Sequence, residues 1–390
     1  MLGINPEQPQ VMFIDLNSAF ATTEQQAHKS LRGRPLGVTN RLSKACCVIA
    51  ASYEAKALGI KVGMRLDEAK ILAPDLVMLE TDPPKYHYVY QTLCKIMKSY
   101  SPNVRMKSID EGVIDFHGTL GTVHNRSLES IGLEIKQTLR EKLGSWMKIN
   151  IGIAPNQFLA KTAAGLHKPD GMDTIDSRNL IGIYQSLKLT DLTGIASHYE
   201  ARLNAAGIFT PLQFLEASSD TLRRHVFHSI VGDDWYQRLR GYEVDANPTK
   251  LGMVGRQWVL AKPSAKDDYI LSCFHYLCET TGKKLRYQGV DARGIQVWTR
   301  FQNGEGWQQR KMFKSTFYTD QQIYARALYL LNKRPKHLVR QTMGITCYQL
   351  TPSSRNQLSL LDEVNQQDWL TTAVDEINER YGTFKIYHAN

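Results

Sequence analysis

Three short apolar runs, bordered by acidic or turn-forming residues, constrain the fold of this chain most strongly. They lie at residues 11–14, 113–116 and 149–153. Each run has the length of a buried strand. The first run ends at Asp15 and the second follows an acidic pair, so we expect carboxylates at strand ends that face a cleft.

Helical patterns lie between these runs. Residues 88–100 and 128–143 carry apolar side chains three or four positions apart, and 51–58 is a shorter helical segment. Strands alternating with helices and hairpins predict an α+β fold in which helices cover one face of a sheet. The 390 residues are too many for one compact core, so we expect about three or four modules.

Two further regions are typical of small separate modules. Residues 27–80 follow the first strand as an insertion and predict a small subdomain. Residues 176–242 predict several short helices, with Gly194 in a turn before the helical segment 200–206. A turn with glycine between two helices leaves backbone N–H groups free to bind a phosphate, although glycine also ends helices of every kind.

The positive charge of the chain is concentrated in one region. Residues 250–340 hold 17 Lys and Arg against 6 Asp and Glu, a net charge of +11, while the whole chain carries +10. A concentrated positive field attracts a polyanion such as nucleic acid. Blocks of Lys and Arg also often only solvate a surface, so a merely basic domain is the alternative.

The same basic region predicts a βαββαβ domain. We expect strands at 252–260, 293–302, 309–317 and 338–349, and helices at 267–286 and 320–333. The turn at 303–306 makes the middle strands a hairpin. Two helices then pack on one sheet face and leave the other free. Alternation along the second strand places Gln296, Trp298 and Arg300 on the free face.

Cysteine spacing and hydropathy exclude several classes of protein. The six cysteines include no CxxC pair and no nearby histidines at zinc-ligand spacing, so we expect reduced core thiols. No stretch approaches the roughly 18 consecutive apolar residues of a membrane helix, and the first residues lack the features of a signal peptide. We therefore expect a cytoplasmic protein with no membrane partner.

Asp15, Asp110 and Glu111 are the candidate catalytic residues. Carboxylates gathered in a cleft repel one another unless a cation lies between them. Oxygen ligands combined with substrate phosphates suit Mg²⁺, and two such ions about 3.5 to 4 Å apart can stabilise both the attacking and the leaving oxygen of phosphoryl transfer. Taken alone, each acid is more simply a surface residue or a helix cap. The neighbouring motifs decide between these interpretations.

Four motifs follow one another in a fixed order. They are IDLNSAFATTEQ, AASYEAKALGIKVGM, SIDEGVIDF and GIAPNQFLAKTAAGLHKPDGM. In this order they resemble the motifs of Y-family translesion DNA polymerases, and most closely those of the DNA polymerase IV-like members. The resemblance extends over nearly the whole chain. It implies a right-hand polymerase that adds dNTPs to a primer 3′ end on a DNA template, with low fidelity, in the tolerance of DNA damage.

The resemblance also implies the roles of single residues. Asp15, Asp110 and Glu111 match the metal ligands of the family, with the backbone carbonyl of Leu16 as a further ligand. The implied cofactors are two Mg²⁺ ions, for which Mn²⁺ can substitute. Phe20 matches the steric gate, whose ring fills the space that a ribose 2′-hydroxyl needs. Without the motif, Phe20 would be taken for an ordinary core residue.

A second set of residues matches the family's site for the incoming triphosphate. The set comprises Asn17, Ser18, Ala19, Phe20, Tyr53, Lys56 and Lys168. Tyr53 and Lys56 lie three apart and share a helix face, and Lys168 matches a phosphate-binding lysine. Lys56 stands where arginine is commoner, which keeps the charge and loses bidentate geometry. Asn17 and Gly112 also depart from the family pattern, and neither change removes a metal ligand.

The resemblance implies a division into four domains and a tail. These are a ferredoxin-like palm at 1–18 and 81–175, fingers at 19–80, a thumb with a helix-hairpin-helix at 176–242, a linker at 243–251, a little finger at 252–350 and a tail at 351–390. Thumb and little finger would hold the backbone of primer-template DNA, which carries no sequence code. The candidate backbone contacts are Gly194, Ile195, Arg256, Arg300 and Lys314.

Near the C terminus, residues 357–361 resemble the peptide by which bacterial polymerases bind the sliding clamp. The segment consists of Gln357, Leu358, Ser359, Leu360 and Leu361. Glutamine would fill a polar site and the leucines an apolar pocket. Family peptides often end in phenylalanine, and here a helix is predicted at 367–380. The expected partners are thus DNA, dNTPs and the clamp, and we expect a monomer.

Two other functions compete with polymerase activity. A nonenzymatic repair scaffold would bind DNA and clamp without synthesis, but it does not need three clustered acids. A nucleotidyl cyclase also uses a two-metal carboxylate palm, but it requires neither a backbone-binding hairpin nor a region of charge +11. Primer extension and cyclic product from ATP are the two measurements that separate these alternatives.

Overall fold

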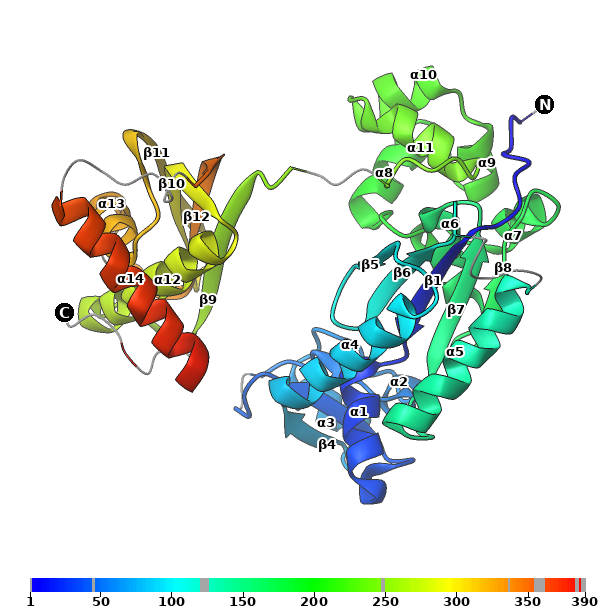
Figure 1. Ribbon diagram of the computed structural model, residues 1–390, viewed down its shortest axis with the longest axis horizontal. Helices are drawn as coiled ribbons and strands as arrows, with labels where there is room; N and C mark the ends of the chain where they lie inside the picture. Colours follow the sequence, from blue (N-terminus) through cyan, green and yellow to red (C-terminus); the bar gives the residue numbers. More distant parts are fainter. Residues whose placement is uncertain are drawn as a thin grey trace. The chain divides into compact units, whose positions relative to one another are not determined.

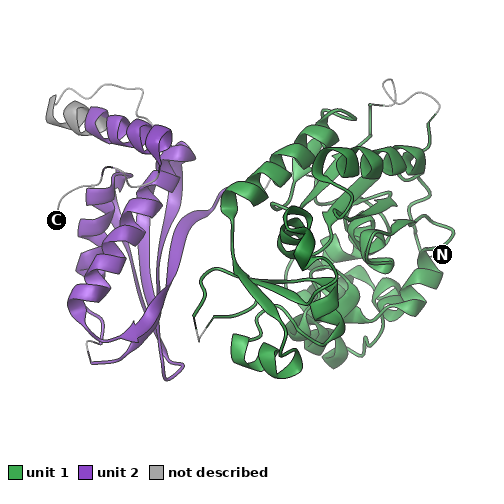
Figure 2. Ribbon diagram, turned by 90° about the horizontal axis from the view of Figure 1, so that it is seen from below, with its two compact units in different colours: residues 1–248 green, residues 249–390 purple. Residues whose placement is uncertain are grey.

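The computed structural model describes residues 2–43, 46–119, 126–246, 250–335, 337–353, 362–382 and 386, the side chains of 362–368 excepted. The chain divides into two compact units, Met1–Pro248 and Thr249–Asn390 (Figure 2). Within the described ranges, no helix is long and apolar enough to cross a membrane.

The central sheet of the first unit has five strands in the order β5-β6-β1-β7-β8. They are β1 (Val11–Leu16), β5 (Val104–Met106), β6 (Glu111–Asp115), β7 (Ile149–Ala154) and β8 (Met172–Thr174). Strand β1 lies in the middle and runs antiparallel to both β6 and β7 (Figure 1). The three predicted strands are therefore confirmed, and they are neighbours in one sheet.

Helices cover both faces of this sheet. Met12 and Ile14 of β1 share a core with α4 (Pro83–Lys98) and α5 (Leu128–Leu143), while the opposite face of β1 packs against α6 (Gln157–Leu166). The prediction of a sheet covered on one face is wrong here. The first four residues of β1 are all apolar and buried, as is typical of a strand with no face toward water.

Local capping sets the helix boundaries. The side chain of Ser127 caps α5, and Gly144 with a φ of 109° ends it, which confirms the helix predicted at 128–143. Helix α4 begins earlier than the predicted 88–100, because the Asp82 side chain caps its first turn and a proline occupies the first helical position.

A second sheet of the first unit has three strands in the order β3-β2-β4. The elements of this region are α1 (Ala19–Ala27), a 3-10 turn at Lys29–Leu31, β2 (Leu36–Thr39), β3 (Ala50–Ala51), α2 (Tyr53–Ala57), α3 (Leu66–Leu72) and β4 (Val77–Glu80). Helix α2 corresponds to the helix expected at 51–58. It begins after Ser52, whose Oγ accepts a hydrogen bond from the Ala55 N–H at 3.2 Å.

The last part of the first unit is helical, as predicted for 176–242. It contains α7 (Leu180–Ser186), a 3-10 turn at Leu189–Asp191, α8 (Ser197–Ala205), α9 (Pro211–Glu216), α10 (Ser219–Thr221), a π-helical turn at Leu222–Phe227 and α11 (Val231–Leu239). Phe214, Phe227 and Trp235 form its aromatic core. Phe158 of α6 meets Trp235 edge to face, with 5.4 Å between ring centroids, so this region shares a core with the central sheet.

The second unit is a βαββαβ domain, as predicted. Its elements are β9 (Met253–Ser264), α12 (Asp267–Tyr287), β10 (Val290–Phe301), β11 (Gly306–Phe317), α13 (Asp320–Leu331) and β12 (Arg340–Pro352). The four strands form an antiparallel sheet in the order β11-β10-β12-β9. Its core joins residues of the sheet with apolar residues of α12 and α13.

Alternation along β10 separates two faces of this sheet. Ile295 and Val297 are buried under the helices, whereas Trp298 is partly exposed and Arg300 is exposed on the other face. The predicted free face is therefore confirmed. Gly344 of β12 accommodates Trp298, because a β-carbon at this glycine would lie 2.4 Å from the indole ring.

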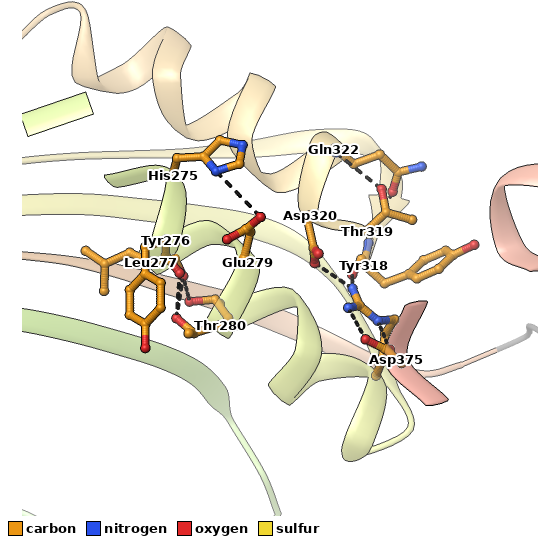
Figure 3. A network of polar contacts seen from close by, with 12 residues as sticks. His275, Tyr276, Leu277, Glu279, Thr280, Tyr318, Thr319, Asp320, Gln322 and Asp375 are labelled. Carbon is orange, nitrogen blue, oxygen red and sulfur yellow. Dashed lines mark hydrogen bonds and ion pairs between the residues drawn. The ribbon is translucent and has the colours of Figure 1, made fainter. Parts of the chain in front are cut away.

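A final helix, α14 (Asp362–Tyr381), begins earlier than the predicted 367–380. Asp375 of this helix and Asp320 of α13, both labelled in Figure 3, bind the same residue of α12, Arg286. Its guanidinium donates to both carboxylate oxygens of Asp375 at 2.5 and 2.8 Å and to Oδ1 of Asp320 on α13 at 2.7 Å. One buried arginine thus binds two carboxylates and holds α12, α13 and α14 together.

The six cysteines are all free thiols. Cys46, Cys278 and Cys347 are buried, as predicted for core thiols, whereas Cys47 is exposed. The prediction of core positions therefore holds for only part of the set.

Candidate active site

Asp15 and Glu111 lie opposite each other on neighbouring antiparallel strands. They are partners in the register of β1 and β6. Asp110 is adjacent, and its carbonyl oxygen accepts a hydrogen bond from the Leu16 N–H at 2.9 Å. The backbone thus brings the three predicted acids, from two distant segments of the chain, to one end of the central sheet.

Two lysines neutralise two of these acids. Lys168 Nζ donates to Oδ2 of Asp15 at 2.5 Å. Lys161 Nζ, on α6, donates to both carboxylate oxygens of Glu111 at 2.9 and 2.8 Å. Each carboxylate therefore faces a cation supplied by the chain itself.

The third acid has a neutral partner. Ser108 Oγ donates to Oδ1 of Asp110 at 2.5 Å. With the side chains in these positions, no three His, Cys, Asp or Glu side chains of the described ranges are close enough to hold a metal ion.

The donor chemistry of the acids fits a hard divalent cation. The side chains of Asp15 and Glu111 are 19% and 20% exposed, so both can be reached from solvent. All three acids offer oxygen ligands, which Mg²⁺ prefers, and Mg²⁺ commonly completes its shell with water and substrate phosphates. The residues present thus fit such an ion in ligand type and in backbone placement.

Ser18, Tyr53 and Lys56 form a second polar cluster near Asp15. Lys56 Nζ donates to Ser18 Oγ at 2.7 Å and lies 4.8 Å from the centroid of the Tyr53 ring. Burial and the charge of Asp15 raise the pKa of Tyr53 to about 12, so its hydroxyl stays protonated at neutral pH. Burial and the charge of Lys168 lower the pKa of Lys56. Two lysines near one hydroxyl-rich cluster suit a ligand with several negative charges.

Three residues of the predicted nucleotide and metal set are buried. The Asn17 side chain is 1% exposed, and its Oδ1 accepts a hydrogen bond from the Asp170 N–H at 2.8 Å. Leu16 and Ala19 are also buried. Their side chains are therefore not available to a ligand, which agrees with the backbone role expected for Leu16 and argues against side-chain contacts from Asn17.

The ring of Phe20 packs against a tyrosine ring that is itself held by a hydrogen bond. Its ring stacks on Tyr86 of α4, with 4.3 Å between centroids and 12° between planes. The Tyr86 hydroxyl donates to Oε1 of buried Glu24 at 2.8 Å, and Lys85 Nζ donates to Oε2 at 2.6 Å. Burial and the hydrogen bond to Glu24 raise the pKa of Tyr86. A ring supported in this way is suited to excluding a substituent by steric contact.

Sequence reasoning missed Lys161, Glu24 and Tyr86. Lys161 is the charged residue of α6, whose other residues are uncharged, and this isolated charge is the signal that could have found it. Glu24 and Tyr86 are far apart in the chain and share no spacing that indicates contact. Their pairing follows only from the packing of α1 against α4.

The turn at Gly194 lies in the helical region, as expected. The backbone N–H group that we expected to be free for a phosphate is, at Ile195, already bonded. Gly194 has a φ of 95°, and a β-carbon there would lie 3.3 Å from the Trp235 ring. Ile195 is buried, and its N–H donates to the Leu192 carbonyl at 3.0 Å. The Ile195 N–H is thus already bonded within the turn.

The three basic candidates of the second unit do not share one face. Arg300 is exposed on the free face of the sheet, and Lys314 is exposed on β11. Arg256 lies opposite buried Ile345 in the β9–β12 register, which places it on the side that the helices cover. The structure therefore separates Arg256 from Arg300.

The predicted clamp peptide at 357–361 lies outside the residues that the structure describes.

Comparison with known protein families gives two matches. Residues 14–165 match the impB/mucB/samB family, and residues 253–360 match the C-terminal domain of the same family. The first match contains all three acids, and the second contains most of the basic domain.

Individual relatives match over almost the full chain. DNA polymerase IV of Moorella thermoacetica is 30% identical over 388 residues, which cover 97% of this chain and 95% of that protein. DNA polymerase IV 1 of Bacillus subtilis is 26% identical, with 97% and 92% covered. Among solved structures, a Y-family DNA polymerase chimera of Dbh and Dpo4 superposes with a TM-score of 0.75 at 23% identity, covering 88% of this chain and 99% of that one.

Proposed function

This chain belongs to the impB/mucB/samB family and is a Y-family DNA polymerase, and from that premise we propose how its residues carry out translesion DNA synthesis. It is a DNA-directed DNA polymerase, which adds deoxynucleotides to a primer 3′ end and releases pyrophosphate. It requires a divalent metal ion, and its partners include primer-template DNA and nucleotides.

Asp15, Asp110 and Glu111 are the proposed ligands of two Mg²⁺ ions, with the Leu16 carbonyl as a further ligand. The observation that carries this proposal is the position of Asp15 directly opposite Glu111 across β1 and β6. When bound, such ions favour the deprotonated primer hydroxyl and neutralise charge on the triphosphate. Mn²⁺ offers the same oxygen chemistry and should substitute.

The chain's own residues bind and orient the nucleotide. Lys56 and Lys168 supply positive charge to the triphosphate, and the protonated Tyr53 hydroxyl donates a hydrogen bond to it. Phe20, supported by Tyr86, excludes a ribose 2′-hydroxyl from the sugar site. Positioning and charge neutralisation account for most of the catalysis expected in phosphoryl transfer.

The domains take the usual roles of a right-hand polymerase. We assign the palm to 1–18 and 81–175, the fingers to 19–80, the thumb to 176–242 and the little finger to 252–350. The free face of the little-finger sheet, with Arg300, holds the DNA backbone. Residues 357–361 bind the sliding clamp, and the enzyme acts as a monomer.

Primer extension tests this function. Wild-type protein is incubated with a primed template, dNTPs and Mg²⁺, beside the Asp110→Ala, Glu111→Ala double variant. Extension by wild type alone supports the assignment. Equal extension, or none by either protein, overturns it, and the second result would favour a DNA-binding scaffold. Cyclic product from ATP would instead indicate a cyclase.

A further inference from the structure

A buried lysine of α5 points toward the segment that carries Lys168. The Lys136 side chain is only 9% exposed, and Leu139, three residues further along the same helix face, is a core residue. Its Nζ donates to the carbonyl oxygen of Asp170 at 2.5 Å and to Oδ1 of the same residue at 3.3 Å. A buried ammonium is costly unless it is paired, so this contact decides where the Lys136 side chain lies.

Asp170 is held from two further sides. Arg140, one turn along α5, donates to Oδ2 of Asp170 at 2.5 Å. The Asp170 N–H donates to Oδ1 of buried Asn17 at 2.8 Å. Asp170 also has a φ of 62°, a conformation that residues other than glycine rarely adopt and that surrounding contacts must maintain.

The segment around Asp170 is tightly folded. A β-carbon on Gly171 would lie 2.0 Å from the His167 carbonyl oxygen, so the chain bends back on itself at this point. The Gly171 carbonyl in turn accepts a hydrogen bond from Ile151 of β7 at 3.1 Å. Lys168 lies inside this fold, and its ammonium reaches Asp15 at the end of β1.

We propose that Lys136 is a positioning residue for the nucleotide site, which fixes the 167–171 turn through Asp170 and thereby sets where the Lys168 ammonium meets the triphosphate. This inference rests on the proposed role of Lys168. Asn17 belongs to the same set of contacts, because its side chain links Asp170 by a hydrogen bond to the chain segment directly after Asp15.

The position of Lys136 favours this role over a purely structural one. A methionine or leucine would fill the same space without the cost of burying a charge. The ammonium instead contacts Asp170, two residues from Lys168. Supporting contacts of this kind hold a functional side chain in its productive geometry, and small displacements of such groups are costly.

The central experiment measures single-nucleotide insertion by Lys136→Met, which keeps the length of the side chain and removes its charge. We expect KM for dNTP to rise about tenfold while kcat changes by less than about twofold, the pattern of lost ground-state binding. Lys136→Arg should restore KM. Lys142→Met, at an exposed position of the same helix, is the matched control and should match wild type.

A double variant separates positioning from general loss of structure. If Lys136 acts through Lys168, the Lys136→Met, Lys168→Ala protein should have the KM of Lys168→Ala alone. If the KM increase of the double variant equals the product of the increases of the two single variants, the inference is overturned. A normal KM for Lys136→Met would also overturn it. If Lys168→Ala itself leaves KM unchanged, the proposed phosphate contact fails instead.

A milder variant covers the case in which Lys136→Met does not fold. Arg140 is 43% exposed and binds the same carboxylate, so Arg140→Met should fold and raise KM for dNTP in the same direction by about threefold. An unchanged KM in Arg140→Met, with Lys136→Met unfolded, would assign Lys136 to stability alone and contradict the inference.

Discussion

Asp15 lies directly opposite Glu111 across the antiparallel strands β1 and β6, although the two residues are far apart in the chain. Each carboxylate is paired with a lysine, Lys168 for Asp15 and Lys161 for Glu111. The end of the central sheet is thus a small charged site that contains two acid–lysine pairs and a third acid, Asp110. A Y-family polymerase needs both kinds of charge there, acids for metal ions and cations for phosphates.

The stacked pair of Phe20 and Tyr86 predicts the sugar selectivity of the enzyme. Phe20→Ala should increase insertion of rNTP relative to dNTP by about 100-fold, because it removes the bulk that blocks the 2′-hydroxyl. Tyr86→Phe keeps the stacked ring and loses only the hydrogen bond to Glu24, so it is the control and should discriminate nearly as well as wild type. Single-nucleotide insertion kinetics measure both. Unchanged discrimination in Phe20→Ala would mean that the gate is another residue.

The two faces of the little-finger sheet predict which arginine contacts DNA. Arg300→Ala should reduce the slope of log affinity against log salt concentration by about 1, as expected for one lost phosphate contact. Arg256→Ala removes the same charge from the side of the sheet that the helices cover, and it should leave the slope unchanged. Fluorescence anisotropy with primer-template DNA at several salt concentrations measures the slope. The reverse order of effects would place the DNA on the other side.

Glu279 predicts how the second unit responds to pH. It is buried near Asp320, and its Oε1 lies 3.6 Å from Nδ1 of His275 (Figure 3). Burial and the charge of Asp320 raise its pKa from the usual 4.5 to about 7. The folded state therefore binds more protons than the unfolded state between these values, and the stability due to Glu279 is lost as pH rises through 7.

Replacing this carboxyl with an amide should remove that loss. Glu279→Gln should raise the Tm of the full chain at pH 8 and have a much smaller effect at pH 5. Exposed Glu379→Gln is the control and should change neither value. Thermal unfolding followed by circular dichroism at the two pH values measures the difference. An equal change in Tm at pH 5 and pH 8 would show that Glu279 does not titrate in this range.

The sequence predicted much of this fold because its signals are local. Apolar runs and the turn at 303–306 were sufficient for the βαββαβ order of the second unit, and Ser127 and Gly144 mark the ends of α5. The packing of helices on both faces of the central sheet was not predicted. The apolar run of β1 indicates burial on two sides, but it does not identify α6 as the second cover.

The candidate site likewise contains residues that the sequence identified and contacts that it did not. The motifs located the three acids, Phe20 and Lys168 as candidates, since these depend on spacing along the chain. The contacts of Lys161 with Glu111, and of Lys136 with Asp170, join residues separated by many positions and depend on how helices pack on the sheet. No spacing rule predicts such pairs. The single charge of helix α6, Lys161, is the only hint that the sequence offers, because Lys136 is one of several charged residues in α5.

The most direct test of the account concerns the acids at the end of the central sheet. Single-turnover insertion of a correct dNTP with Mg²⁺ is measured for Asp15→Asn, Asp110→Asn and Glu111→Gln, each of which keeps the shape of the side chain. Exposed Glu141→Gln on α5 is the control. We predict that each of the three site variants loses about 1,000-fold in rate, because a group that stabilises transition-state charge is removed, while the control retains the wild-type rate. Insertion at the wild-type rate by any of the three would contradict the proposed catalytic site.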